Sequence, residues 1–561
     1  MSAQPVRSAQ RAIETLTAHG VDYVFGVPGA KIDAVYDALV DAGPQLVVCR
    51  HEQNAALMAA AVGRLTGTPG AAVVTSGPGT TNLLTGLITA NTEQYPMVAL
   101  CGAVPRADRL KRTHQSMDAT AALRPFTKFV GEVDDPDDVG EALADALRAA
   151  LTEPRGATAV ILPADVLSAL TSAEITRPLP VPALGPAPQD EILRAARLIR
   201  GAERPALLVG LRAADAKACA ALHTLIDGTD LPVVETFQAA GAVSRELEGH
   251  FLGRVGLFRN QPGDIVIAKA DVLVTVGYDA VEYDPGLWNT DPDRTIIHID
   301  ALPADIDNHY QPALELRGDV ASTLNELGRL VSGLRLGEQA NAAIAEQRAA
   351  LRGIDREAQI ESATAAGLNP AAVVLKIREH VDDDATVVCD VGSHYIYTAR
   401  HFRAYQPGHL LFSNGQQTLG VALPWAMAAS IVRPRTQIVS ISGDGGFLFS
   451  AQELETAKRL GLRLTHIIMR DNTYDMVGFQ ELLKYGRKSG VQLGDYDIVQ
   501  YAGAFGGKGV RVHSMQEFET ELKTALDRDL LGEPGVTVID VHVDYTHNTD
   551  LFAQLHDGVL E

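Results

Sequence analysis

Apolar and polar positions alternate along this chain in two different rhythms. Short runs rich in Val, Ile, Leu and Ala are typical of buried strands, and longer segments with apolar residues three or four positions apart are typical of helices. In the first third, Ala12, Ile13 and Leu16 mark such a helix, which Gly20 ends. Strand-like runs follow at 21–26, 46–49, 71–75, 97–101 and 157–162. Because strands that alternate with helices form parallel sheets, this part predicts an α/β domain.

The same rhythm occurs twice more, after two breaks. The first break is the proline-rich segment 177–188, which has the composition of a linker, and the second is the charged helical segment 324–360. Strands are predicted at 206–209, 233–236, 272–276 and 295–299 before the second break, and at 386–389, 410–412, 437–441, 464–469 and 536–541 after it. We therefore predict an α/β fold of three tandem doubly wound domains, over residues 1–176, 189–335 and 362–546.

Two acidic side chains follow neighbouring strands of the third predicted domain. Asp444 lies in a glycine-rich turn directly after strand 437–441, and Asp471 follows strand 464–469. A right-handed crossover between parallel strands brings both acids to the same edge of the sheet. Carboxylate oxygens bind hard cations, and the N–H groups of the glycines can approach an anion. The unit therefore indicates a site for Mg²⁺ and a phosphate group, the alternative being a solvent-facing acidic turn.

The helix between these two strands has its own start signal. Ser450 and Glu453 have the spacing of a capping box, in which each side chain bonds the backbone N–H near the other. Leu454, Ala457 and Leu460 then form an apolar stripe. We predict that Ser450 caps this helix and that Glu453 completes the box.

Glu52 is a third acid at a strand end, in a different predicted domain. It follows strand 46–49 and precedes the helical segment 54–65, which is rich in small residues. It is therefore expected at the carboxyl edge of the first sheet, where a catalytic acid would lie. The alternative is that Glu52 only stabilises the positive end of the helix dipole.

Composition excludes several classes of protein. The chain has 561 residues and a net charge of −22, and its Lys and Arg residues form no cluster, so a nucleic-acid partner is not expected. No apolar run is long enough to span a membrane, and the first residues lack a signal-peptide pattern, so we expect a cytoplasmic protein with no membrane partner. The four cysteines are scattered without a CxxC pair, which is typical of buried thiols in a reducing compartment.

The unit around Asp444 resembles the signature of thiamine-diphosphate (ThDP) enzymes, in which GDG is followed, after a helix and a strand, by an asparagine pair. Here Asp471 and Asn472 occupy that second position, so an aspartate replaces the usual metal-binding asparagine. Since an aspartate binds a hard cation at least as well as an amide does, this departure keeps the metal site. The resemblance implies ThDP and Mg²⁺ as cofactors, with Asp444, Asp471 and the backbone carbonyl of Thr473 as metal ligands.

A closer resemblance, to the acetolactate synthases, extends from about Val6 to Tyr545. It rests on the segments 25–33, 50–52, 75–79 and 114–118 in the first domain, 254–258 and 281–285 in the second, and 413–426 and 474–480 in the third. The resemblance implies a pyrimidine-binding, a central and a diphosphate-binding domain. The sequence is most similar to the catabolic, flavin-independent type, for which FAD is not expected.

Roles for individual residues come from this resemblance. Glu52 corresponds to the residue that bonds N1′ of the cofactor's aminopyrimidine, and Leu419 to an aliphatic residue, often Met, that separates the two cofactor rings. The remaining cofactor contacts implied are Ser393, His394, Gln417, Gly445, Gly446, Tyr474 and Met476. Lys31 and Gln115 are implied beside Glu52 as catalytic residues. The substrate pocket implied consists of Lys31, Gln115, Met476, Val477 and Gln480.

The resemblance also implies an activity and an assembly. The activity is the decarboxylating condensation of two pyruvate molecules to 2-acetolactate and CO₂ through hydroxyethyl-ThDP. In the family the pyrimidine domain of one subunit faces the diphosphate domain of another, so a homodimer or homotetramer with active sites at the subunit interface is expected.

Other interpretations stay open at this point. A biosynthetic, FAD-containing acetohydroxyacid synthase shares these motifs, but Gln480 replaces a tryptophan that shapes its second-substrate pocket. Pyruvate decarboxylase or oxidase shares the ThDP motifs, and a non-catalytic protein on this scaffold would not need its three acids. Among single residues, Lys31 could be a solvated lysine, His114 a structural histidine and Met476 a core residue.

Overall fold

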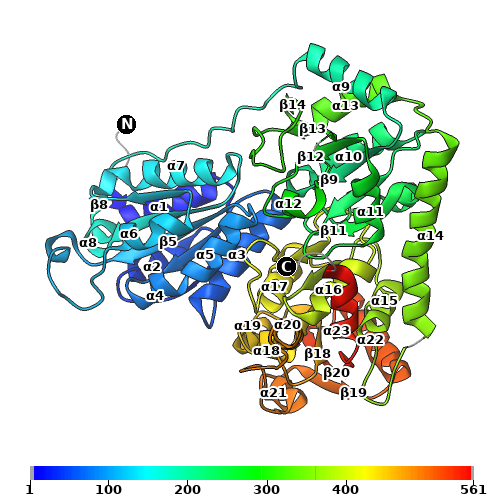
Figure 1. Cartoon of the computed structure of the whole chain (residues 1–561). Coiled ribbons are helices and arrows are strands. Elements are labelled where there is room, and N and C mark those ends of the chain that lie inside the picture. Colours follow the sequence, from blue (N-terminus) through cyan, green and yellow to red (C-terminus); the bar gives the residue numbers. More distant parts are fainter. Residues whose placement is uncertain (1–4, 292, 361, 557–561) are drawn as a thin grey trace.

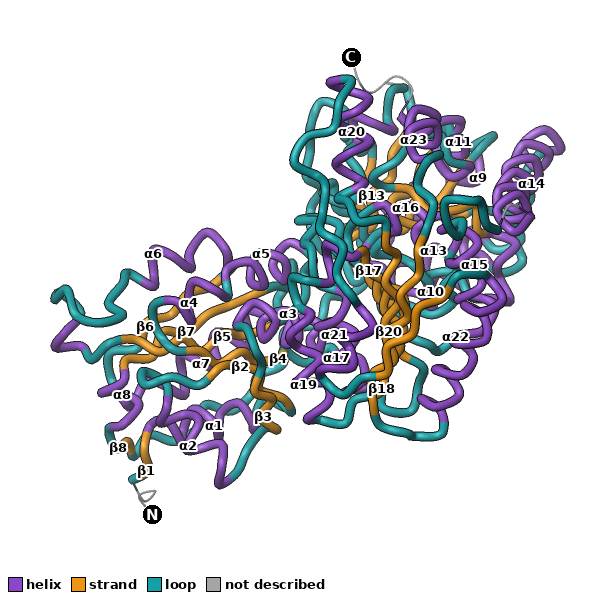
Figure 2. The backbone as a smooth tube through the Cα atoms, turned by 90° about the horizontal axis from the view of Figure 1, so that it is seen from below, coloured by secondary structure: helices purple, strands orange, loops and turns teal. Residues whose placement is uncertain are grey.

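The computed structural model describes residues 5–291, 293–360 and 362–556. Three lobes are arranged around one junction, and each contains a parallel sheet of six strands (Figure 1). Helices cover both faces of each sheet, as the view from below shows for the third lobe (Figure 2). The predicted α/β fold of three tandem doubly wound domains is confirmed, whereas the predicted domain boundaries stay a prediction.

The first lobe holds a sheet with the order β3-β2-β4-β5-β7-β6. Its strands are β2 (Tyr23–Val27), β3 (Gln45–Val48), β4 (Gly70–Val74), β5 (Met97–Ala103), β6 (Phe129–Glu132) and β7 (Ala157–Pro163). Its helices are α1 (Ser8–Ala18), α2 (Asp33–Asp41), α3 (Glu52–Thr66), α4 (Pro78–Asn82), α5 (Leu84–Thr92), α6 (Ala119–Leu123), α7 (Val139–Leu151) and α8 (Ala164–Ser168). A two-stranded antiparallel pair, β1 (Val6–Arg7) and β8 (Leu170–Thr171), joins the two ends of the lobe.

The central lobe has a different strand order, β11-β10-β9-β12-β13-β14. Its strands are β9 (Pro205–Val209), β10 (Val233–Thr236), β11 (Phe251–Val255), β12 (Val272–Val276), β13 (Thr295–Asp300) and β14 (Leu314–Arg317). Its helices are α9 (Gln189–Gly201), α10 (Ala216–Ile226), α11 (Pro262–Lys269), α12 (Pro285–Trp288) and α13 (Val320–Val331). This is the strand order of dinucleotide-binding folds. The first three strands are added toward one edge of the sheet and the next three toward the other, so the order reverses between the first and fourth strands, here β9 and β12.

The third lobe repeats the topology of the first, with the order β16-β15-β17-β18-β20-β19. Its strands are β15 (Thr386–Cys389), β16 (Leu410–Phe412), β17 (Ile438–Gly443), β18 (Arg463–Arg470), β19 (Lys508–Val512) and β20 (Gly535–His542). Its helices are α15 (Pro370–His380), α16 (Ser393–His401), α17 (Ala422–Val432), α18 (Asp444–Phe447), α19 (Leu454–Arg459), α20 (Asp475–Tyr485), α21 (Ile498–Ala504), α22 (Met515–Leu530) and α23 (Asn548–His556). The two outer lobes therefore share one topology, although their sequences are alike only in pattern.

Two connections join the lobes. The proline-rich segment forms no helix or strand, and it runs along the top of the molecule to α9 (Figure 1). The long helix α14 (Glu338–Ile360) leads from the central lobe down to the third, where the carboxylate of Asp355 bonds His401 and Arg403.

The first and third lobes meet through α3 and α17, which lie side by side at the junction (Figure 2). Helix α3 is buried from Asn54 to Gly63, and α17 is buried from Ala422 to Ser430. Both helices are rich in alanine, and a helix buried on all sides needs no polar face. Helix α3 begins at Glu52, and α17 begins shortly after Leu419. This helix pair therefore connects the two regions in which cofactor-binding residues were predicted.

One local prediction is wrong. Ser450 makes no capping bond, and the segment 451–453 is a short 3-10 helix that leads into α19. Glu453 instead turns toward the first lobe, where its Oε1 accepts hydrogen bonds from the backbone N–H groups of Arg50 and His51. Glu453 therefore serves a contact between the first and third lobes instead of a capping box, which the local sequence pattern could not reveal.

None of the helices in the described part of the chain combines the length and apolar character needed to cross a membrane.

Candidate active site

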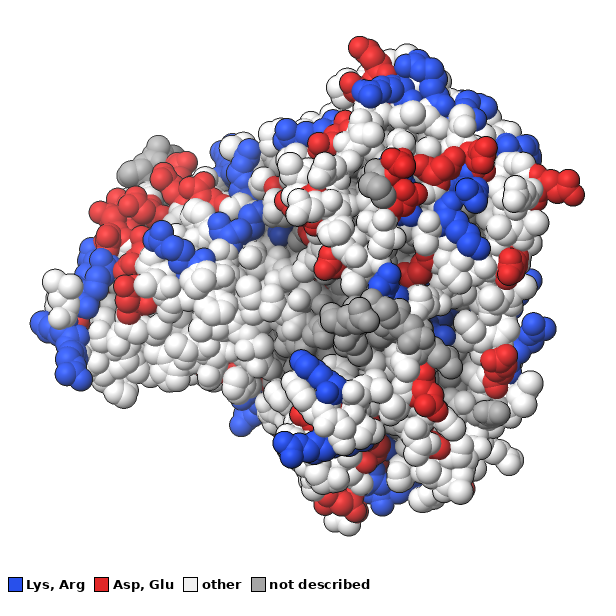
Figure 3. Space-filling model, in the orientation of Figure 1, with Lys and Arg blue, Asp and Glu red and all other residues white. Residues whose placement is uncertain are grey.

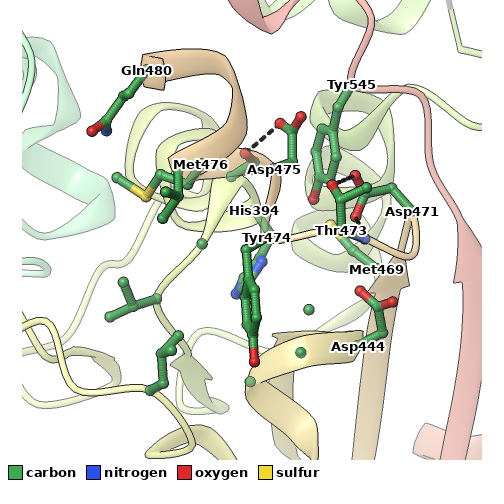
Figure 4. Close-up of a pocket in the computed structure, with 18 of the residues that line it drawn as sticks. His394, Asp444, Met469, Asp471, Thr473, Tyr474, Asp475, Met476, Gln480 and Tyr545 are labelled. Atoms are coloured by element: carbon green, nitrogen blue, oxygen red, sulfur yellow. Dashed lines mark hydrogen bonds between the residues drawn. The ribbon is translucent and has the colours of Figure 1, made fainter. Parts of the chain in front are cut away.

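The two acids of the third lobe lie side by side at the carboxyl edge of its sheet. Strands β17 and β18 are parallel and pair Gly443 with Met469, so that Asp444 starts α18 while Asp471 follows β18 one residue beyond. Both side chains line one pocket, and Thr473 lies beside Asp471 (Figure 4). The hydroxyl of Thr473 donates to Asp471 Oδ2 at 2.5 Å, and a left-handed Asn472, with φ 61°, turns the chain to allow it.

Electrostatics at these acids favour a bound cation. Burial raises the pKa of Asp444 to about 6. Burial, together with the negative charges of Asp475 and Asp444, raises the pKa of Asp471 to about 6. Asp444 Oδ2 is buried and has no hydrogen-bond partner among the described residues. A buried, unpartnered carboxylate oxygen costs free energy, and a coordinated cation removes that cost.

The opposite wall offers donors for an anion. Helix α16 begins at Ser393, so its free N–H groups and its dipole face the pocket. Burial lowers the pKa of His394 to about 3, which keeps the imidazole neutral, and its Nε2 is buried without a partner among the described residues. Two glycines at the base of the pocket leave no room for a side chain. A Cβ at Gly445 would lie 2.5 Å from the Tyr474 ring, and a Cβ at Gly446 would lie 2.9 Å from the Asp390 carboxylate. A neutral imidazole, a helix amino-terminus and bare glycine backbone together fit a diphosphate group.

A third wall is the loop before α17. Asp390 holds this loop, since both of its carboxylate oxygens accept the N–H of Gly420, at 2.9 and 3.0 Å. Gln417 is left-handed with φ 48°, and the neighbouring Thr418 hydroxyl bonds that of Thr89 in the first lobe at 2.7 Å. The loop is therefore fixed from both sides, which presents Gln417 and Leu419 to the pocket.

The pocket enclosed by these walls has a volume of about 270 Å³. It brings together thirteen of the residues predicted from sequence: Ser393, His394, Gln417, Leu419, Asp444, Gly445, Gly446, Asp471, Thr473, Tyr474, Met476, Val477 and Gln480. Met476 and Gln480 lie at the end away from the two acids (Figure 4). Sequence reasoning missed the other lining residues, which are Val391, Gly392, Gly443, Met469, Asp475 and Tyr545.

Two of the missed residues have defined roles in the wall. The Asp475 carboxylate accepts the Ser393 hydroxyl at 2.7 Å and the Asn548 amide at 2.6 Å, so it fixes the start of α16. Its place directly after Tyr474 was the signal available in the sequence. Tyr545 reaches the pocket from beyond β20, and its hydroxyl is buried without a partner among the described residues. Nothing in its local sequence indicates that position.

The three catalytic residues predicted in the first lobe do not line this pocket. Glu52 is the first residue of α3, half-buried, and its Oε2 accepts the Asn82 amide at 2.9 Å. The backbone N–H of Lys31 donates to the Thr75 hydroxyl. Gln115 lies next to Gly77, where an added Cβ would be 3.4 Å from its side chain. All three therefore surround the turn after β4, at the carboxyl edge of the first sheet. The predicted site residues of one chain therefore lie in two separate clusters, one in the first lobe and one in the third.

Family comparisons agree with this division into lobes. Residues 7–122 match the thiamine pyrophosphate enzyme N-terminal TPP binding domain, 192–327 match the central domain, and 390–541 match the C-terminal TPP binding domain. The fold and the site thus define the class as a thiamine pyrophosphate enzyme.

Full-length relatives narrow the class. The chain is 50% identical to the acetolactate synthase of Bacillus subtilis (strain 168) over 97% of this chain and 94% of the relative. It is 43% identical to the catabolic acetolactate synthase of Raoultella terrigena over 99% and 98%, and 30% identical to the acetolactate synthase isozyme 2 large subunit of Escherichia coli (strain K12) over 97% and 96%. The chain belongs to the acetolactate synthase family of thiamine pyrophosphate enzymes.

Proposed function

We propose that this protein condenses two pyruvate molecules to 2-acetolactate and CO₂, using bound ThDP and Mg²⁺. The observation that carries this proposal is the pocket of the third lobe, in which an unpartnered Asp444 carboxylate faces Asp471 beside the start of α16. The full-length similarity to a catabolic acetolactate synthase supports the choice of reaction over that of a decarboxylase or an oxidase.

In this proposal Asp444, Asp471 and the carbonyl of Thr473 hold Mg²⁺, and the start of α16 with Gly445 and Gly446 holds the diphosphate. When bound, ThDP supplies a thiazolium carbon that can carry negative charge next to the substrate carbonyl. The Glu52 carboxyl group would form a hydrogen bond at the N1′ position of the aminopyrimidine and so take part in proton transfer there. Leu419 keeps the two rings apart, and the Gln417 carbonyl bonds the aminopyrimidine edge.

The substrate end of the site consists of residues from both clusters. Lys31 supplies a cation for the pyruvate carboxylate, which the strongly acidic protein would otherwise repel. Gln115 donates to the substrate carbonyl. Met476 and Val477, at the start of α20, line the pocket with apolar surface that excludes water, and Gln480 borders the position of the second keto acid.

Each complete site is proposed to need two chains, in a homodimer or homotetramer. Glu52 does not line the pocket of its own chain, so a second copy is required to bring a Glu52 to it. Large apolar side chains are exposed around the pocket, with Leu448 48%, Phe449 45% and Val477 50% exposed. The lower face of the first lobe is also almost free of charged side chains (Figure 3). Exposed apolar surface of this kind is typical of subunit interfaces.

We further propose that the central lobe carries no flavin. In its strand order a dinucleotide would place its pyrophosphate at the turn after β9. There the carboxylate of Glu282 accepts the Leu211 N–H at 3.0 Å and the Thr236 hydroxyl at 2.6 Å, and it would lie 2.5 Å from a Cβ on Gly210. A buried acid thus fills the position that an anionic pyrophosphate would need.

The cytoplasm is the proposed location. Its support is the set of four cysteines, all of which are buried as free thiols, since free buried thiols are typical of a reducing compartment.

The test is an assay of the purified protein with pyruvate, ThDP and Mg²⁺, with no flavin added and the products identified by NMR. We expect acetolactate as the main product, formed by protein that shows no flavin absorbance. We also expect that EDTA abolishes the activity and that added Mg²⁺ restores it. Acetaldehyde as the main product would overturn the proposed reaction, and no turnover would favour the non-catalytic alternative.

A further inference from the structure

A second cavity, of about 480 Å³, lies where the three lobes meet and shares no lining residue with the cofactor pocket. The first lobe contributes the carboxyl-terminal end of α3, and the third contributes the loop before β16 and the end of α17. The central lobe contributes the turn after β9. Five basic side chains line the cavity: Arg64, Arg155, Arg212, His409 and Arg433.

Two of these arginines are neutralised by carboxylates. Arg155 pairs with Glu153 at 2.8 Å, and Arg212 pairs with Asp279 at 2.7 Å and with Asp300 at 2.8 Å. These pairs account for the charge of two guanidinium groups, so they offer no attraction to an anion in the cavity.

Arg64 and Arg433 are different, because neither takes part in an ion pair within the described part of the chain. Arg433 donates only to neutral oxygens, the Thr386 hydroxyl at 2.7 Å and the Gly408 carbonyl at 2.9 Å. Arg64 donates to backbone carbonyls at 3.4 Å and lies over the Tyr95 ring, 5.7 Å from its centroid, and its Nε is buried without a hydrogen-bond partner among the described residues. Two uncompensated guanidinium groups therefore face one cavity in a protein with a net charge of −22.

Helix dipoles offset part of this charge, but not all of it. Arg64 lies in the last turn of α3 and Arg433 directly follows α17, and each helix end offers roughly half a negative charge. Together the two helix ends supply about one negative charge, which is half of what the two arginines would need. Asp215, the other carboxylate of the cavity, is occupied in capping α10. Burial, and then the positive charge of Arg64, lower the pKa of Arg433 to about 10, against a smaller opposing effect of the Asp384 carboxylate, which forms no ion pair with it.

We propose that this cavity binds a small phosphate-bearing molecule, with Arg64 and Arg433 as its charged contacts. A phosphate monoester carries close to two negative charges and three acceptor oxygens, so it can bond both guanidinium groups at once, whereas a carboxylate has two oxygens and one charge for the two groups. The planar guanidinium group is also suited to paired hydrogen bonds with phosphate oxygens. The volume exceeds what one phosphate group needs, so we expect the ligand to carry an organic group as well. Such a ligand would contact all three lobes.

The test is isothermal titration calorimetry of the full-length protein saturated with ThDP and Mg²⁺, with AMP and inorganic phosphate as probes and chloride at equal ionic strength as the salt control. Saturable binding of one molecule per chain is expected. Tighter binding of AMP identifies a phosphorylated metabolite as the ligand, and equal binding identifies free phosphate; both support the site. The absence of saturable binding of either probe to the wild-type protein overturns the proposal, whatever the variants do.

Variants locate the binding. Arg64→Gln and Arg433→Gln are each expected to weaken probe binding by about tenfold or more, the usual effect of losing one charge-assisted hydrogen-bonding partner. Arg435→Gln is the matched control, because Arg435 is exposed two residues further on and does not line the cavity. Unchanged affinity in both cavity variants would place the probe elsewhere and contradict the proposal.

Discussion

At the scale of single residues, the cofactor pocket is defined by atoms that lack partners. Asp444 Oδ2, His394 Nε2 and the Tyr545 hydroxyl are all buried and unpaired within the described residues. A folded chain seldom leaves such groups unsatisfied unless a ligand completes them. Their arrangement, with an acid at one end and a neutral imidazole nearby, matches the charge pattern of a metal diphosphate.

Gly445 gives a direct test of how closely the backbone must approach that ligand. A Cβ there would lie 2.5 Å from the Tyr474 ring, so Gly445→Ala should push the ring into the pocket. We expect ThDP to bind about ten- to a hundredfold more weakly, as for other overpacked sites. Fluorescence titration with ThDP measures this change.

Gly494→Ala is the control for that substitution, because nothing lies within 4 Å of its added Cβ. Equal ThDP affinity in both variants would show that the Tyr474 ring does not shape the diphosphate site.

The sequence was informative about residues wherever a strand end marked the position. Asp444, Asp471 and Glu52 could each be placed at a carboxyl edge from the pattern alone, and they lie there in the structure. Tyr545 could not, because only the pairing of β20 with β18 brings its segment beside Asp471. A contact that depends on the pairing of two strands far apart in the chain leaves no pattern in the local sequence.

At the scale of secondary-structure elements, the strands of the sheet centres could be predicted to within two residues, whereas four of the six edge strands of the six-stranded sheets were missed. These four are β6, β11, β14 and β19; the edge strands β3 and β16 were predicted, and the short pair β1 and β8 was also missed. Strand β11 shows the physical reason. Its apolar run is interrupted by Arg254, which is buried only because Glu235 on β10 neutralises it at 3.2 Å. A charged residue in a short run argues against a strand until its partner is known.

Glu453 attaches the start of helix α3 to the third lobe. Its Oε1 accepts from the N–H groups of Arg50 and His51 and from the Asn54 amide, so Glu453→Ala leaves one buried and two partly buried donors unpaired. We expect a loss of at least about 3 kcal/mol of stability, together with reduced activity because Glu52 begins this helix. Urea unfolding and turnover measure the two effects.

Glu455→Ala controls for a change of charge on the same helix. Glu455 makes a partly exposed i,i+4 pair with Arg459, so its loss should cost less than about 0.5 kcal/mol. If Glu453→Ala were as stable as this control, the proposed attachment between the lobes would be incorrect.

At the scale of the whole molecule, Glu93 ties the three lobes together. It lies at the end of α5, and its carboxylate accepts the amide of Gln238 from the central lobe and the N–H of Gly415 from the third. Burial raises its pKa to about 7. Its partners are 145 and 322 residues away, so no local sequence pattern indicates this junction.

A pH dependence of stability follows from Glu93. Because its pKa is raised in the folded protein, its contribution is complete below the unfolded pKa and is lost as the pH rises through about 7. Glu93→Gln cannot lose a proton, so its stability relative to the wild type should improve by about 2–3 kcal/mol between pH 5 and pH 8. Thermal unfolding of both proteins at the two pH values measures this difference.

Glu357→Gln, on the exposed face of α14, is the charge-matched control and should follow the wild type at both pH values. A constant offset between Glu93→Gln and the wild type would mean that Glu93 is already ionised in the folded protein at pH 5.

We propose that a pyruvate-condensing site forms from Glu52 of one chain and the Asp444 pocket of another. The most direct measurement mixes two inactive proteins, Glu52→Gln and Asp444→Asn, allows their subunits to exchange, and assays acetolactate formation. With sites shared between chains, half of the sites in mixed dimers are intact, so an equal mixture should recover about one quarter of wild-type activity. No recovery after proven exchange would mean that each chain completes its own site, and it would contradict the account.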